Sequence, residues 1–252
     1  MSVHLQTPAA RGQLTTPPMV TLGIDLSSQP ANTAASVIEW ANGSAVARPP
    51  RLHCSDGDLS QLIDSAEAIG IDAPFGWPME FVAAVNDWPH DTWSQEGRDR
   101  LRFREADRFV RATQSVWPLS VSTDTIALPA MRAMSLLKKH GVTDRSGDGR
   151  FFEVYPAASL RAWTMTSRGY KEAKKPECVE ARQRILVALR TAMPWLVAPD
   201  DYAEDSDALD SLVAALTARC AWQGRTMPPD QAQKAIAQRE GWIHIPNGLP
   251  VP

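Results

Sequence analysis

Two aspartates at the ends of short apolar segments are the residues whose type and position best suit chemistry. Asp25 comes at the end of Met19–Leu26 (MVTLGIDL), and Asp72 ends Ala68–Asp72 (AIGID). If the two segments form neighbouring parallel strands, both carboxylates lie at one carboxyl edge of the sheet, where ligands bind in open α/β sheets. Two unpaired carboxylates repel each other unless one is protonated or a cation lies between them. A divalent cation with oxygen ligands would relieve the repulsion, so the pair predicts a metal site.

A second pair of acids lies late in the chain. Asp207 and Asp210 are three residues apart in DALDSLVAALTA, a spacing that puts both on one helix face near the end where the dipole favours negative charge. Acids at helix starts are also routine capping residues, and that interpretation stays open. The helix carries apolar side chains that would bury part of its surface, namely Leu209, Leu212, Val213 and Leu216. Burial of that face would place the acids near the sheet.

A fifth acid, Glu153, lies inside the predicted strand Phe151–Tyr155 (FFEVY), which Pro156 ends. Successive side chains of a strand point to opposite faces, so Glu153 either faces solvent or points to the sheet edge. In the second case it would be another metal ligand.

The elements that must position these acids predict an α/β fold. An antiparallel meander is predicted for Met19–Leu26, Thr33–Trp40 and Ser44–Cys54, with Asn42-Gly43 as a hairpin turn. A helix over Leu59–Ala68, capped by Asp58, would return the chain so that the strand ending at Asp72 runs parallel to the first. Further helices are predicted at Met79–Val85, Ala127–His140, Glu177–Ala192 and Asp207–Trp222, the last with Ser206 as a possible cap. Asp87–Gly97 reads as a loop and Trp242–Ile245 as a last strand.

Composition restricts the function classes. The net charge is -3, and the sequence pI is about 6.0, so the strongly basic footprint typical of tight duplex binding is absent and a nucleic-acid surface would have to be a local patch. The cysteines are three in number and scattered, without a C-x-x-C pair, which favours reduced thiols in a cytoplasmic protein over disulfides or zinc. No apolar stretch is long enough to span a bilayer, so no membrane partner is expected.

Several cationic and aromatic residues are candidates for substrate binding. The arginines Arg104, Arg108 and Arg111 could hold phosphates, or they could form ion pairs on a solvated helix, for example Arg104 with Asp107. Trp77, close to Asp72, could stack a base or pack in the core. The lysines before Pro176, which are Lys171, Lys174 and Lys175, read as a solvated loop or a weak backbone-contacting patch.

Five segments, in order, resemble a family of predicted nucleases known as domain of unknown function 429. They are GIDLSS (Gly23–Ser28), IDAPFGWP (Ile71–Pro78), READRFVR (Arg104–Arg111), EVYPAASL (Glu153–Leu160) and DALDSLVAA (Asp207–Ala215). The resemblance covers about residues 19–246 and extends to the order of elements of the ribonuclease H-like fold. The D-x-x-D-x-L pattern in the last of them is also similar to the final helix of Holliday-junction resolvases.

The resemblance implies a ribonuclease H-like mixed sheet, an antiparallel three-strand meander plus parallel strands, flanked by helices. One such domain would cover residues 18–252, with a helical insertion around 79–145, after a disordered tail over residues 1–17.

The resemblance also implies metal-dependent phosphodiester hydrolysis. Asp25 would be the first-strand acid that bridges two ions, Asp72 the fourth-strand acid, and Asp207 and Asp210 the acids of the last helix. Two Mg²⁺ or Mn²⁺ ions roughly 4 Å apart would activate water and stabilise the leaving oxygen. The fourth-strand acid of such nucleases is often glutamate, so the shorter arm of Asp72 is a departure that could shift a metal. Glu153 and Tyr155 fall in a family motif without a transferable role.

The predicted function is therefore a metal-dependent nuclease or related phosphodiesterase acting on DNA or RNA. Its catalytic acids would be Asp25, Asp72, Asp207 and Asp210, its metal ligands the same acids with Glu153, and its substrate-binding residues Arg104, Arg108, Arg111 and Trp77. Two alternatives stay open. One is a kinase-like phosphotransferase, because GID followed by serines resembles a phosphate-binding hairpin, although the duplicated domain and glycine-rich adenosine loops of such kinases are missing. The other is a non-catalytic binding module on the same scaffold.

Overall fold

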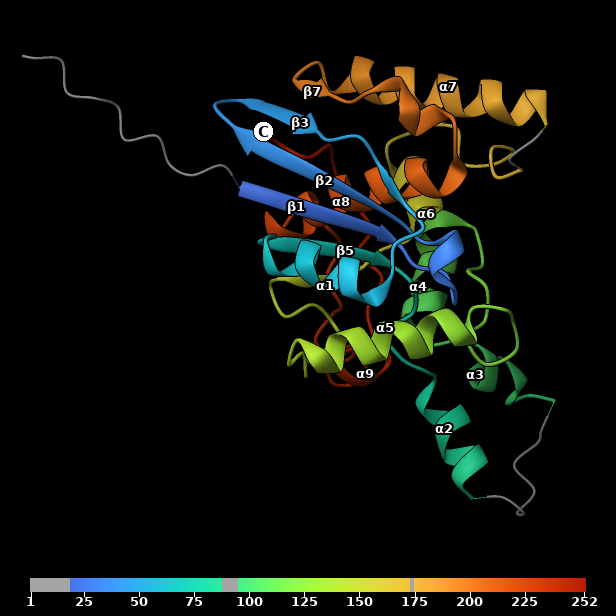
Figure 1. The fold of residues 1–252 in the computed structure, drawn as a ribbon. Coiled ribbons are helices and arrows are strands. Elements are labelled where there is room, and N and C mark those ends of the chain that lie inside the picture. Colours follow the sequence, from blue (N-terminus) through green and yellow to red (C-terminus); the bar gives the residue numbers. More distant parts are fainter. Residues whose placement is uncertain (1–18, 88–94, 173–174) are drawn as a thin grey trace, which may run out of the picture.

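The fold is described by a computed structural model for residues 19–87, 95–172 and 175–252 (Figure 1). The tail expected over residues 1–17 and most of the loop expected over Asp87–Gly97 lie outside these ranges. Within them, no helix is both long and apolar enough to cross a membrane.

A seven-stranded mixed sheet forms the centre of the molecule, in the order β6-β5-β1-β2-β3-β7, with β4 paired to β2. The strands are β1 (Met19–Asp25), β2 (Ala34–Ala41), β3 (Ser44–Ala47), β4 (Arg51–Leu52), β5 (Ala68–Asp72), β6 (Phe151–Glu153) and β7 (Leu196–Val197). Strands β1, β2 and β3 form the predicted antiparallel meander, and β5 runs parallel to β1. Asn42 and Gly43 both have positive φ, as a two-residue type I′ hairpin turn requires. The predicted α/β class with a mixed sheet is confirmed.

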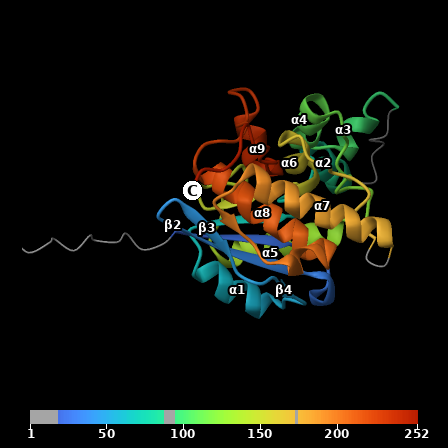
Figure 2. The ribbon, with the colours of Figure 1, turned by 90° about the horizontal axis from the view of Figure 1, so that it is seen from above.

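Helices cover both faces of the sheet (Figures 1 and 2). They are α1 (Asp56–Asp64), α2 (Met79–Asn86), α3 (Arg98–Arg102), α4 (Glu105–Gln114), α5 (Ala127–Lys139), α6 (Pro156–Ala162), α7 (Pro176–Ala192), α8 (Ser206–Trp222) and α9 (Lys234–Glu240), with short 3-10 turns at Pro30–Asn32 and Asp200–Ala203. Helices α1 and α5 pack on one face through a core that includes Ile24, Ile71 and Leu136. Helices α7 and α8 pack on the other face. Along the chain, helices α2 to α5 all come after β5 and before β6.

Three local predictions need correction. Helix α1 begins one turn earlier than expected, because Ser55 is its N-cap and Asp58 instead completes the capping box from inside the helix. Helix α8 is capped by Asp205 and not by Ser206, because the Asp205 carboxylate accepts hydrogen bonds from the backbone N–H groups of Asp207 and Ala208. The segment predicted as a last strand makes only an isolated parallel bridge, from Ile243 to Glu153, within the described ranges.

Candidate metal centre

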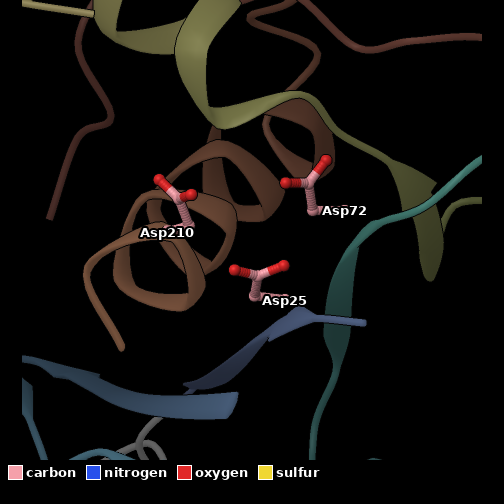
Figure 3. A group of neighbouring side chains, drawn as sticks. All are labelled: Asp25, Asp72 and Asp210. Carbon is pink, nitrogen blue, oxygen red and sulfur yellow. The ribbon is translucent and has the colours of Figure 1, made fainter. Parts of the chain in front are cut away.

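Three of the predicted acids converge at the carboxyl edge of the sheet. Asp25 and Asp72 are directly paired across the parallel β1–β5 ladder, and Asp210 comes from the second turn of α8. Each contributes a carboxylate oxygen, and these oxygens all lie within 4.8 Å of one another. Figure 3 shows the three side chains as neighbours, with Asp25 on β1, Asp72 on β5 and Asp210 on α8. We call Asp25, Asp72 and Asp210 the acid cluster.

A repeated Gly-Ile-Asp ending explains why the two strands aim their acids at α8. Residues two apart on a strand point to the same face, so Gly23 lies on the face of Asp25, and Gly70 on the face of Asp72. A Cβ on Gly23 would lie 2.0 Å from the backbone oxygen of Ser211, and one on Gly70 would lie 2.5 Å from a backbone oxygen of the same helix. The glycines therefore let α8 approach the sheet backbone, which brings Asp210 to the other two acids.

Asp210 is completely buried and, among the described residues, contacts Tyr170 and Lys171. The hydroxyl of Tyr170 donates a hydrogen bond of 2.8 Å to one carboxylate oxygen, and the ammonium of Lys171 forms an ion pair with the other. The Lys171 side chain is 55% exposed, so it reaches the acid cluster from solvent. The sequence predicts a solvated loop or weak patch for Lys171, and no local pattern indicates its contact with Asp210.

Burial and mutual repulsion make the acid cluster hard to ionise. Burial, and then the charge of Asp72, hold the pKa of Asp25 well above its ordinary value. Burial raises the pKa of Asp72 to about 7, although the Lys171 ammonium lowers it. The metal-free cluster therefore retains protons at pH values where ordinary aspartates have lost them, and a bound cation would replace those protons.

Asp207 lies one turn before Asp210 but is not one of the three converging acids. Its carboxylate accepts a hydrogen bond of 3.2 Å from Ser206. Burial, followed by the charge of Asp205, raises the pKa of Asp207, and its own charge contributes to the raised pKa values of Asp25 and Asp72. Asp207 thus acts on the acid cluster through its charge.

Glu153, predicted as a possible metal ligand, points to the other face of the sheet. It is paired with Ile71 in the parallel β5–β6 ladder, and Ile71 faces the core beneath α5, whereas Asp72 faces α8. Its buried carboxylate accepts hydrogen bonds from Arg104 at 2.7 and 2.9 Å and from the backbone N–H of Phe75 at 2.9 Å. The pairing with Ile71 therefore directs Glu153 toward Arg104 and not into the acid cluster, although Glu153 lines the same cavity as Asp25 and Asp72 and its charge raises the pKa of Asp72.

Arg104, predicted to bind substrate, is buried and fully engaged. A guanidinium has five N–H donors. Here they contact Asp107 twice, Glu153 twice and the carbonyl of Glu240 once, at 2.7 to 3.2 Å. Arg104 has no donor left for a phosphate. It joins α4 to β6 and to the end of α9.

The other residues predicted to bind substrate, unlike Arg104, do not line the cavity that contains Asp25 and Asp72. Arg108 pairs with Glu105 at 2.8 Å, as the ion-pair alternative expected, and Arg111 donates to the carbonyl of Ser115 at 2.9 Å. Trp77 lines a separate cavity between α2 and α9. Contacts within the helical region 79–145, and beside it for Trp77, hold these side chains away from the acid cluster.

We expect Glu153→Gln to lower the free energy of unfolding by roughly 1–3 kcal/mol while changing Mn²⁺ affinity only slightly, through the loss of its charge near Asp72. The amide keeps the volume but leaves the buried Arg104 without one of its charged acceptors. Chemical denaturation and calorimetric Mn²⁺ titration measure the two quantities on the same preparation. A large loss of Mn²⁺ affinity in a stably folded variant would return Glu153 to the metal ligands.

A cavity of about 500 Å³ opens beside the acid cluster, and we call it the main cavity. Asp25 and Asp72 lie in its wall together with Tyr155, and Arg168 and Lys171 bring basic groups to it. Arg168 is exposed and makes no hydrogen bond or ion pair with the described part of the chain. A cavity with acids in its wall, an Arg168 that is unpaired within the described ranges and a Lys171 that pairs with Asp210 can bind a cation together with an anionic substrate.

The donor set fits a hard divalent cation such as Mg²⁺ or Mn²⁺. All three converging groups are carboxylates, the ligands that these ions prefer, and the ammonium of Lys171 already lies among them as a cationic partner.

Comparison with known proteins gives one family match. The model of the family described as "Protein of unknown function (DUF429)" matches residues 23–234, which include every residue of the acid cluster. No curated protein and no solved structure matches the chain.

Proposed function

Since the chain belongs to the family described as Protein of unknown function (DUF429), we propose its function from the site itself. The protein is a metal-dependent nuclease or related phosphodiesterase whose metal ligands are Asp25, Asp72 and Asp210. The observation that carries this proposal is the convergence of three carboxylates within 4.8 Å at the carboxyl edge of the sheet.

The arrangement of the strands supports a ribonuclease H-like fold for this enzyme. An antiparallel meander, a helix, a parallel strand and a late acid-bearing helix follow one another as the resemblance implies. The acids lie on the first strand, on the strand parallel to it and on the late helix. The positions of these acids support the function, whereas the sheet order alone would not, because fold does not fix function.

Different groups of the chain would bind the metal and the substrate. When bound, a divalent ion supplies a water of lowered pKa and stabilises negative charge on the reacting phosphate. Asp25, Asp72 and Asp210 would hold the ion, and Tyr170 would fix the orientation of Asp210 through its 2.8 Å hydrogen bond. Arg168 would bind phosphate oxygens in the main cavity, and Lys171 would do so once the bound ion displaces it from Asp210.

The test is cleavage of labelled DNA and RNA oligonucleotides, single-stranded and duplex, with Mg²⁺, Mn²⁺ or EDTA. We expect cleavage of at least one substrate with a divalent ion and none with EDTA. If the protein binds no Mn²⁺ in calorimetry and cleaves nothing, the proposal is wrong, and a non-catalytic binding module becomes the better interpretation.

Mn²⁺ affinity should fall as the pH is lowered through about 7, because protons on Asp72 compete with the ion. The metal-free protein should show the opposite trend in stability. The folded pKa of Asp72 is raised, so the folded state binds this proton more tightly than the unfolded state, and stability decreases as the pH rises from about 4 to about 7. Calorimetric titration at pH 5.5, 6.5 and 8, with melting curves in EDTA, measures both. An Mn²⁺ affinity that does not change over this range would contradict the raised pKa.

A further inference from the structure

We propose that a second cavity beside the main cavity holds a nucleobase of a single-stranded substrate next to the scissile phosphate. The proposal deepens the nuclease function and rests on it. The second cavity, which we call the side cavity, has a volume of about 370 Å³ and is lined by Arg98, Arg102, Trp117, Leu119 and Asp124, among others.

The side cavity and the main cavity are neighbours. Pro118 and Leu119 line both, so the two cavities share part of their walls. A strand whose phosphate lies against the acid cluster could therefore extend over Leu119 and place an adjoining base in the side cavity. Leu119 is 55% exposed, an apolar contact surface at the point where such a strand would cross.

Trp117 gives the side cavity a fixed aromatic surface. The ring is 40% exposed and stacks on buried Phe103, with centroids 4.1 Å apart and planes inclined by 20°. Arg102 lies over the Phe103 ring at 4.8 Å, and Arg111 lies 5.8 Å from the Trp117 centroid. Packing on Phe103 holds the exposed indole in one orientation, which lowers the entropy cost of stacking a ligand on it. Aromatic rings flanked by arginines are the platforms on which single-stranded nucleic acids stack.

The charges around the side cavity fit a neutral base better than a phosphate. Two arginines line it, but so do Asp99 and Asp124. Arg98 is paired with Asp99 at 3.4 Å, and Asp124 accepts a backbone hydrogen bond from Ser120 at 2.8 Å. Nearly balanced charges offer hydrogen-bond donors and acceptors to a base edge without a strong attraction for an anion. The exposed basic groups that suit phosphate, Arg168 and Lys171, line the main cavity instead.

A base can enter such a cavity only when it is unstacked and unpaired. Bases of a duplex are held inside the helix, whereas a single strand exposes them at little cost. The geometry therefore points to single-stranded DNA or RNA as the preferred substrate over duplex.

The test is fluorescence anisotropy with a labelled single strand in EDTA, which prevents cleavage, on the full chain. We expect Trp117→Ala to weaken binding by about 5- to 100-fold, the range of one base–aromatic stack, and Trp117→Phe to retain most of the affinity. Trp222→Ala is the matched control, because Trp222 is 48% exposed and lies 5.3 Å from Arg219 but lines neither cavity. An abasic oligonucleotide of the same length should bind the Trp117→Ala variant and the unchanged protein equally well.

Equal effects of Trp117→Ala and Trp222→Ala, a Trp117→Ala penalty that persists on the abasic strand, or no binding of the single strand by the unchanged protein would each overturn the proposal. Melting temperatures of the variants show whether they are folded, and Trp117→Phe decides the matter if Trp117→Ala is not. Mn²⁺ binding and cleavage are measured separately. If the protein shows divalent-dependent cleavage but Trp117→Ala does not weaken binding, only the proposal for the side cavity is rejected. Base-dependent binding without any divalent-dependent cleavage rejects the nuclease function alone.

Discussion

Asp25→Asn should lower divalent-dependent cleavage by more than about 100-fold and weaken Mn²⁺ binding, with the fold intact. Loss of a hydrogen-bonding partner of a metal ligand already costs roughly 10- to 100-fold in affinity or activity, and Asp25 is proposed as a ligand itself. The metal-free variant should be at least as stable as the unchanged protein at pH 8, because the substitution removes one of the repelling charges. Initial cleavage rates, calorimetry and melting curves in EDTA measure the three effects.

Two other aspartates serve as controls for this prediction. Asp207→Asn lies one turn from Asp210 but outside the acid cluster, so we expect a smaller loss that arises from its charge alone. Asp201→Asn, at an exposed position before α8, should leave cleavage unchanged. Cleavage by Asp25→Asn at the unchanged rate, or an equal loss in Asp201→Asn, would mean that the acid cluster does not carry the activity.

Gly23→Ala should lower the free energy of unfolding by about 3 kcal/mol or more, at or above the upper end of the range for overpacking a core. The new Cβ would lie 2.0 Å from the backbone oxygen of Ser211 and 2.3 Å from the backbone nitrogen of Ala215, so α8 must move away from the sheet. For a protein of this size the melting temperature should fall by roughly 10 °C. Because Asp210 moves with α8, Mn²⁺ affinity should fall as well.

Gly57→Ala is the matched control for this substitution. A Cβ on Gly57 would meet only the Ser55 hydroxyl, at 3.6 Å, and alanine is a better helix former than glycine by up to about 1 kcal/mol. We therefore expect this variant to be slightly more stable than the unchanged protein. Equal melting temperatures for Gly23→Ala and the unchanged protein would show that α8 does not lie against the sheet backbone as described.

The positions of Asp25, Asp72 and Asp210 could be predicted because each depends on a local pattern. Two short apolar segments ending in Gly-Ile-Asp, separated by the rest of the meander and a helix, form parallel neighbours whose last residues lie together. The spacing from Asp207 to Asp210 placed both on one face of a buried helix. Which of the two joins the cluster depends on the rotation of α8, and the contacts at Gly23 and Gly70 set that rotation.

Glu153 shows why a short strand is harder to interpret. Whether its side chain faces α8 or α5 depends on which residue of β5 it is paired with, and a shift of one residue reverses the answer. Nothing in FFEVY specifies that register. The buried ion pair with Arg104 joins residues 49 positions apart, a contact that no local pattern encodes.

The helix caps could not be predicted because neighbouring residues are similarly good capping residues, and the contact of Lys171 could not be predicted because it depends on the path of a loop. Ser55 and Asp58, or Asp205 and Ser206, are all good capping residues, and the backbone path selects between them. Lys171 lies in the loop between α6 and α7, and its contact with Asp210 depends on the path of that loop. The sequence between these elements contains no spacing that would indicate the contact.

The location of bound Mn²⁺, measured by anomalous diffraction from crystals soaked in the ion, is the decisive observation. We expect a peak among the carboxylates of Asp25, Asp72 and Asp210, with the ammonium of Lys171 moved off Asp210. A structure in which these carboxylates lie too far apart to share an ion, or in which Mn²⁺ binds elsewhere and leaves them empty, would contradict the proposed metal centre.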